Sequence, residues 1–152
     1  DGKKYQTDKK YFRAGQMATS SDLSLAREKA LLITKQRLAS NVESVLKSVT
    51  DRYVREAEVA KAMEFQQDYE NETREVVRLT MRDVVIACEA THVLKDGNFR
   101  TFIAVEMDKE AILDTLDSRI SRNDRLRLEY DQQRFREIFE EEMEKLENDM
   151  NL

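Results

Sequence analysis

The fold is decided by residues 10–40, which read KYFRAGQMATSSDLSLAREKALLITKQRLAS. The first part, residues 10–18, is bounded by polar side chains and carries Tyr11, Phe12 and Met17, which predicts a β-strand. Gly15 suggests a β-bulge within this strand. Three side chains that can cap a helix, by accepting hydrogen bonds from its first unpaired backbone N–H groups, follow the strand: Ser20, Ser21 and Asp22.

A long amphipathic helix is predicted from this cap to about Ala60. Its apolar residues recur at intervals of three, four or seven positions, at Leu31, Leu38, Val42, Val45, Val49 and Tyr53. Alanines at positions 26 and 30 leave one side of the helix narrow, so that a sheet or a second helix can approach closely. The chain has no proline and three glycines, so few positions interrupt a helix.

A β-hairpin is predicted from residue 84 to residue 107. Two β-rich segments, 84–94 and 99–107, flank Asp96-Gly97, which is a typical turn sequence. A two-residue turn would place Lys95 opposite Asn98. The resulting register puts eight residues on one face, which we take as the core face: Leu94, Phe99, Ala90, Ile103, Cys88, Val105, Ile86 and Met107. The opposite face holds mostly polar side chains, among which Phe102 is an apolar exception.

The remaining segments give a provisional division of the chain. Residues 64–75 are rich in Gln, Asp, Glu and Asn and are interpreted as a connection before a short helix over 72–82. Asp108 can cap a helix over 109–120, and a last amphipathic helix is predicted from about Arg125 to Asp149. We therefore expect a flexible tether over residues 1–9, an α+β domain over 10–120 and a C-terminal amphipathic helix over 121–152.

The residue types that carry chemistry are scarce in this chain. His92 is the only histidine and is interpreted as a partly buried structural residue, since no cluster of ligands for a metal surrounds it in the sequence. Cys88 is the only cysteine, lies in the most apolar run and is predicted to be a buried, inert thiol. No glycine-rich phosphate loop is present. We expect no enzyme activity, no cofactor and no metal, and the net charge of −5 argues against nucleic-acid binding.

The order of several short motifs resembles a known family. Phe12-Arg13-Ala14-Gly15, Ser21, the alanines at 26 and 30 and Leu38-Ala39 are followed by the hairpin turn Asp96-Gly97-Asn98-Phe99. Over residues 10–108 this order resembles the twenty-kilodalton LPP lipoprotein family of bacterial envelopes. Thr34 departs from it, because an alanine is typical at that position.

The resemblance implies a location and an architecture. Members of the family are secreted, acylated on a cysteine that becomes the mature amino terminus, and held at the outer membrane. They are described as a long helix packed on a small antiparallel sheet. For this chain the resemblance implies an outer-membrane or periplasmic location, with a lipid anchor attached outside the sequence given, shortly before Asp1.

We therefore predict an α+β fold, in which a long amphipathic helix packs on an antiparallel sheet of about three strands and a helical extension protrudes at the C-terminus. The expected function is a non-enzymatic envelope lipoprotein domain that binds or scaffolds proteins and self-associates. Two alternatives stay open, a small-ligand carrier with a cavity between helix and sheet, and a cytoplasmic helical adaptor. The candidate partner-binding residues are Phe102, Phe139, Met143 and Leu146.

Overall fold

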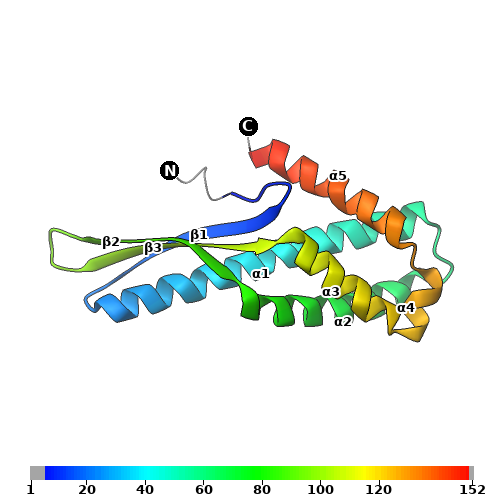
Figure 1. Cartoon of the computed structure of the whole chain (residues 1–152), viewed down its shortest axis with the longest axis horizontal. Coiled ribbons are helices and arrows are strands. Elements are labelled where there is room, and N and C mark those ends of the chain that lie inside the picture. The colour runs from blue at the N-terminus through cyan, green and yellow to red at the C-terminus, as the bar shows by residue number, and fades with distance from the viewer. Residues whose placement is uncertain (1–5, 151–152) are drawn as a thin grey trace.

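The computed structural model describes the backbone of residues 6–150. Within them the chain forms an α+β fold, with a three-stranded antiparallel sheet and five α-helices, as predicted (Figure 1). In chain order the elements are β1 (Tyr11–Ser20), α1 (Leu23–Glu56), α2 (Ala62–Thr80), the 3₁₀ turn η2 (Met81–Asp83), β2 (Val85–Val93), β3 (Phe99–Asp108), α3 (Lys109–Ser121), α4 (Asp124–Glu129) and α5 (Gln132–Met150).

Helix α1 organises the whole molecule. Asp22 caps it, accepting a hydrogen bond from the backbone N–H of Leu25 at 2.9 Å. Ala26 and Ala30 are fully buried against the sheet, so the predicted close approach of sheet and helix is confirmed. Thr34 continues this buried side of the helix, and its hydroxyl donates to the carbonyl of Ala30 at 2.6 Å. The same hydroxyl also lies 3.2 Å from the carbonyl of Ile103 on β3. It is therefore satisfied in the buried contact between helix and sheet, which makes a threonine tolerable where an alanine was expected.

The sheet has the strand order β1-β3-β2, and α1 lies along one of its faces (Figure 1). The strand β1 pairs with β3 in a continuous register over its whole length, from Tyr11 opposite Asp108 to Ser20 opposite Phe99. The bulge predicted at Gly15 is therefore absent. The one register shift lies instead in β2, between Ile86 and Cys88.

The predicted hairpin exists, but its predicted register is wrong by one residue. Val93, not Leu94, lies opposite Phe99. The backbone N–H of Gly97 donates to the carbonyl of Leu94 at 3.0 Å, and Gly97 has a φ of 86°. This geometry closes a three-residue loop rather than a two-residue turn, because glycine readily adopts the left-handed conformation that the longer loop needs.

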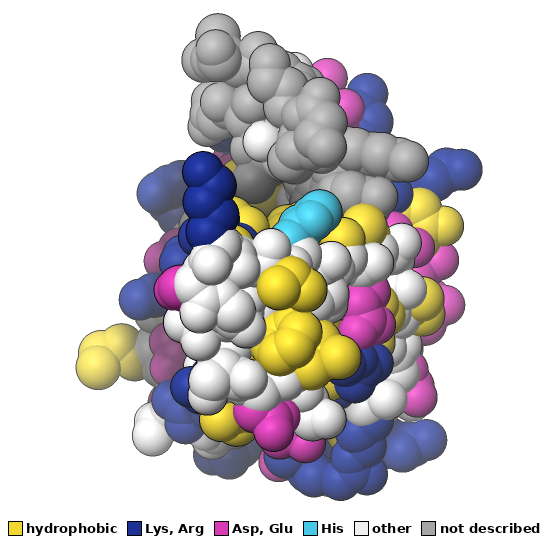
Figure 2. Space-filling model, turned by 90° about the vertical axis from the view of Figure 1, so that its left-hand side faces the viewer, with side chains coloured by type: hydrophobic (Ala, Val, Ile, Leu, Met, Phe, Trp, Pro, Cys, Tyr) yellow, Lys and Arg dark blue, Asp and Glu magenta, His cyan; other side chains and the backbone are white. Residues whose placement is uncertain are grey.

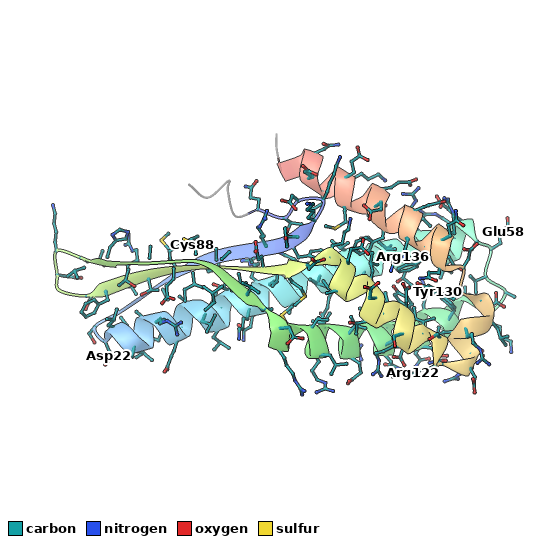
Figure 3. All side chains as sticks on the ribbon, in the orientation of Figure 1. Asp22, Glu58, Cys88, Arg122, Tyr130 and Arg136 are labelled. Carbon is teal, nitrogen blue, oxygen red and sulfur yellow. The ribbon has the colours of Figure 1, made fainter. Side chains whose placement is uncertain are left out.

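The shifted register moves two residues of β2 to the other face of the sheet. Ala90 and Cys88 were expected on the core face, but they lie opposite Phe102 and Ala104 on the face away from α1 (Figure 3). Cys88 is half-buried rather than fully buried. The core-face positions of β3 are as predicted, because Ile103, Val105 and Met107 belong to the main core.

The predicted connection over residues 64–75 is wrong, since these residues belong to α2. The helix packs alongside α1 through an apolar stripe of Phe65, Tyr69, Val76 and Val77. Polar residues between these positions lowered the average hydrophobicity of the segment, although the spacing of the stripe is helical.

The C-terminal helix is not a protruding extension. Helix α5 folds back along α1, and its apolar residues belong to the same hydrophobic core as the sheet (Figure 1). Phe12 of β1 contacts Phe139 of α5 edge-to-face, with 6.2 Å between ring centroids. The division between residues 10–120 and 121–152 therefore does not separate two cores.

Ion pairs connect α5 to α3. The Arg136 guanidinium donates to carboxylates on successive turns of α3, to Glu110 at 2.9 Å, Asp114 at 3.0 Å and Asp117 at 2.7 Å (Figure 3). The hydroxyl of Tyr130 donates to the same Asp117 at 2.5 Å. A cation shared by several acids is the network arrangement in which ion pairs contribute measurably.

Residues 6–9 do not behave as the tether predicted over 1–9, of which residues 1–5 lie outside the described chain. The buried Thr7 hydroxyl accepts a hydrogen bond from the backbone N–H of Arg13 at 3.0 Å. Burial alone would raise the pKa of Asp8, but hydrogen bonds from the backbone N–H groups of Tyr11 and Lys10 and from Arg13 outweigh it and lower this pKa.

Candidate interaction surface on the sheet half

Exposed large apolar side chains concentrate on one half of the molecule. Of the ten in the described chain, eight lie on β1, β2 or the first part of α1, some on the sheet face away from α1 and others on the exposed side of α1 itself. We call this set of eight the sheet-half surface: Met17, Leu23, Leu25, Leu32, Ile33, Val85, Ile86 and Val93. The other two, Met63 and Leu128, lie on α2 and α4. Single exposed apolar residues are normal on a protein, whereas concentration on one region is typical of an interaction surface.

The end of the molecule formed by the hairpin tip and the start of α1 shows part of this surface directly. Figure 2 views that end, where a small group of hydrophobic side chains lies near the centre, with charged side chains both directly beside it and towards the edges. Val93 is 69% exposed beside the hairpin loop, and Leu23 is 48% exposed in the first turn of α1. An apolar centre with a polar rim is the composition that protein interfaces share.

Strand β2 contributes a sheet edge as well as side chains. It pairs only with β3 among the described strands, so its other side presents backbone groups that the sheet does not use. Glu89 points from this edge strand towards α1, where Arg27 donates to it at 2.5 Å. The ion pair connects the strand to the helix, and Val93 lies further along, at the hairpin end of β2.

Three of the predicted partner-binding residues belong to α5 and are placed differently from the prediction. Phe139 and Met143 are fully buried in the core, and Leu146 is half-buried. The predicted seam of α5 is therefore used within this chain, against α1 and β1, because the helix folds back instead of projecting. Phe139 and Met143 cannot contact a partner unless α5 leaves the core.

Phe102 lies on the face of the sheet away from α1, as predicted for the far face of the hairpin. It pairs with Met17 on β1 and with Ala90 on β2, and it is half-buried. Its ring crosses Gly15 so closely that a Cβ atom at Gly15 would lie 2.9 Å from the ring. Gly15 thus leaves room for the Phe102 ring, and does not mark a bulge.

Three further observations concern metal ligands, the single histidine and membrane-spanning helices. Among the side chains that the structure describes, those of residues 6–148, no group of three or more His, Cys, Asp and Glu is arranged to hold a metal ion. His92 is exposed on β2, opposite Arg100, rather than partly buried as predicted. No helix among the described residues is both long and apolar enough to span a membrane.

Sequence reasoning missed the sheet-half surface. Leu25 and Leu32 lie seven residues apart on the side of α1 that points away from the sheet. Their helical spacing could have been recognised in the sequence. It was hidden because the same helix carries a second apolar stripe, which is buried.

Comparisons of the chain with protein-family models, with curated proteins and with solved structures give no match.

Proposed function

We propose that this chain is a non-enzymatic protein-binding or scaffolding domain of a bacterial cell-envelope lipoprotein, and that it binds partners or a second copy of itself through the sheet-half surface. The concentration of exposed apolar side chains on this half carries the proposal. The other half offers few such side chains, because α2, α3, α4 and α5 enclose their apolar residues in one core.

The fold supports the envelope part of this proposal only through the resemblance of its motifs. A long helix with a small-residue side packs on a three-stranded antiparallel sheet, which is the architecture that the resemblance implies. The alanine positions contact the sheet, and the Asp-Gly turn forms the hairpin loop. The lipid anchor itself would be attached before Asp1.

The location is tested by feeding cells a labelled fatty acid and fractionating them. We expect label on the full-length native protein, recovered with the outer membrane. An unlabelled protein in the soluble cytoplasmic fraction would remove the lipoprotein assignment and leave the adaptor alternative.

The surface is tested with a photo-crosslinking amino acid placed at Val93, in the full-length protein in cells. Leu128 provides the matched control, because it is 82% exposed but lies on α4, outside the sheet-half surface. We expect crosslinks from position 93 to a second copy or to an envelope protein identified by mass spectrometry, and none from position 128. Equal crosslinking from both positions, or none from either, would contradict the proposed surface.

A second measurement uses the purified protein. We expect Leu25→Asp combined with Val93→Asp to weaken self-association in analytical ultracentrifugation, because charges are costly in an apolar contact. Leu128→Asp should leave the sedimentation unchanged. A double variant that associates like the unmodified protein, with no loss of crosslinks in cells, would show that this half is not the contact surface.

A further inference from the structure

The two edges of the sheet differ in what the rest of the chain does with them. On the outer edge of β1, the Thr7 hydroxyl accepts a hydrogen bond from the backbone N–H of Arg13 at 3.0 Å. The backbone N–H of Asp8 donates to the Tyr11 carbonyl on the same edge at 2.9 Å. On β2, by contrast, the backbone groups outside the ladder with β3 have no hydrogen bond to a described residue.

The side chains of β2 are open to solvent as well. Helix α1 packs mainly against β1 and β3, so β2 overhangs the helix and is connected to it by the ion pair of Arg27 and Glu89. Val85 and Val93, near the two ends of the strand, are 57% and 69% exposed. A strand of nine residues that is open along one edge can add a further strand to the sheet.

Strand β2 also lacks most of the features by which proteins keep edge strands from pairing. It contains no proline and no lysine, and its one acidic side chain, Glu89, is already paired with Arg27. The register shift between Ile86 and Cys88 distorts only the first part of the strand. From Cys88 to Val93 the pairing with β3 is regular, and natural proteins usually protect such an edge.

The hairpin loop shows which backbone groups of β2 point outwards. The Leu94 N–H donates to the Asn98 carbonyl at 2.8 Å, so these two residues form a hydrogen-bonded pair. Such pairs alternate along an antiparallel ladder, so Ala90 directs its backbone groups towards β3. The N–H and C=O groups of Glu89 and Thr91 therefore point away from the sheet, at the open edge.

We infer that β2 pairs with β2 of a second copy of the chain, antiparallel and around a two-fold axis that passes through Ala90 perpendicular to the sheet. The inference rests on the proposed function, because it names one partner of the sheet-half surface and how that partner binds. Every copy carries the same unpaired edge, and one symmetric contact satisfies both edges at once. The α1 helices stay apart, because each lies mainly against β1 and β3 of its own copy.

The charge of Glu89 selects this register. An axis through Ala90 places Glu89 of one copy opposite Thr91 of the other. An axis through Glu89 would place two carboxylates directly opposite each other, which is unfavourable. An axis through Thr91 would set Glu89 against the apolar side chain of Val93, where burial of the carboxylate is costly. The axis through Ala90 avoids both arrangements.

Hydrogen exchange of backbone amides, followed by NMR, tests the pairing in the unmodified whole chain. The Glu89 and Thr91 amides are unprotected in a monomer, whereas a second copy would hold both in hydrogen bonds. We expect their exchange to slow by about tenfold once about nine-tenths of the chains are paired, and to recover on dilution. The Ala90 amide is the internal control, because it bonds to β3 in either state. Exchange rates at Glu89 and Thr91 that do not depend on concentration would overturn the inference.

Cysteine crosslinking tests the register. Because Ala90 would form a non-hydrogen-bonded pair with its copy, the two Cα atoms would lie about 4.5 Å apart, within the range of a disulfide. In a Cys88→Ser background, we therefore expect Ala90→Cys to give a disulfide-linked dimer on mild oxidation. His92→Cys in the same background is the matched control, and it should stay monomeric on a non-reducing gel.

The control differs from the test variant chiefly in register. His92 lies on the same face of the same strand, but the two copies of this position would be four residues out of register. His92 is also more exposed than Ala90, so random collisions would link it at least as readily. Equal crosslinking of both variants, or none from Ala90→Cys, would refute the axis through Ala90.

The exchange measurement also separates this inference from the proposed function. Chains that associate in analytical ultracentrifugation while the Glu89 and Thr91 amides stay unprotected would refute strand pairing and leave the sheet-half surface as the contact. Protected amides in the purified protein, together with no crosslinks from position 93 in cells, would support the strand pair and count against the surface as a contact in the envelope.

Discussion

The hydroxyl of Tyr53 on α1 donates a hydrogen bond to the backbone carbonyl of Glu129, 2.7 Å away, where α4 ends. The same hydroxyl accepts a bond from the backbone N–H of Asp131 at 2.8 Å. One side chain thus satisfies both backbone groups at the break between α4 and α5. It fixes the point from which α5 returns along α1, because the buried ring of Tyr53 holds both backbone groups in place.

We expect Tyr53→Phe to lower the free energy of unfolding by about 1–3 kcal/mol, since it leaves the Glu129 carbonyl and the Asp131 N–H without their partner. Urea denaturation followed by circular dichroism measures this change. Tyr11→Phe is the control, because the Tyr11 side chain is half-buried on β1 and its hydroxyl has no hydrogen bond to a described residue. Equal stability of the two variants would contradict the role of Tyr53.

The pair of Lys109 and Glu140 gives a prediction about charge burial. Lys109 is 8% exposed, and its Nζ donates to the two carboxylate oxygens of Glu140 at 2.6 and 2.9 Å. Glu140→Ala should destabilise the protein more than Lys109→Met, because only the first leaves a buried ammonium group without its partner. Chemical denaturation of both variants and of the double variant measures the difference. Lys145→Met, in an exposed pair with Glu142, should change nothing, and the reverse order at the first pair would refute this account.

The structure and the predicted partner-binding seam lead to different expectations for a substitution at Phe139. The residue is fully buried against Phe12, so Phe139→Ala should cost about 3–5 kcal/mol of unfolding free energy. Thermal or urea denaturation measures this cost, and Leu128→Ala, on an exposed position, should stay within about 0.5 kcal/mol. A stable Phe139→Ala variant that loses a partner would instead restore the seam.

The buried tyrosines make stability depend on alkaline pH. Burial raises the pKa of Tyr69, and burial together with the carboxylate of Asp117 raises the pKa of Tyr130. In the unfolded chain tyrosine ionises near pH 10, so this contribution is fully present below about pH 10 and is lost as the pH rises further. Denaturation at several alkaline pH values, with tyrosinate absorbance, measures the loss. Tyr130→Phe should show a shallower decline, and an identical decline would contradict the assignment.

Local signals in the sequence were sufficient for several elements. The cap at Asp22 and the alanines at 26 and 30 depend on residues within one or two helical turns, so the start of α1 and its buried side could be predicted. The hairpin was also predicted, but its loop length was not. Lys95-Asp96-Gly97 is compatible with both a two-residue turn and a three-residue loop, and the choice depends on how the two strands twist together.

Long-range features could not be predicted in the same way. The spacing of Phe139 and Met143 indicates an amphipathic helix, but it is the same whether that helix packs on its own chain or on another. A hollow between α1 and α2 is lined by Thr50 and Tyr69, which lie on different helices, and no sequence pattern indicates that these two residues come together. Its absence from the predictions follows from the misassignment of residues 64–75 as a connection.

The continuity of α1 fixes the spacing between the two halves of the molecule. At 1.5 Å per residue its 34 residues extend about 50 Å, from the hairpin end to the helices that enclose the other end. Neither a proline nor a glycine interrupts it, so the helix has no built-in hinge. The hairpin end and the end formed by α4 and the start of α5 are therefore held apart at a set distance by one uninterrupted helix.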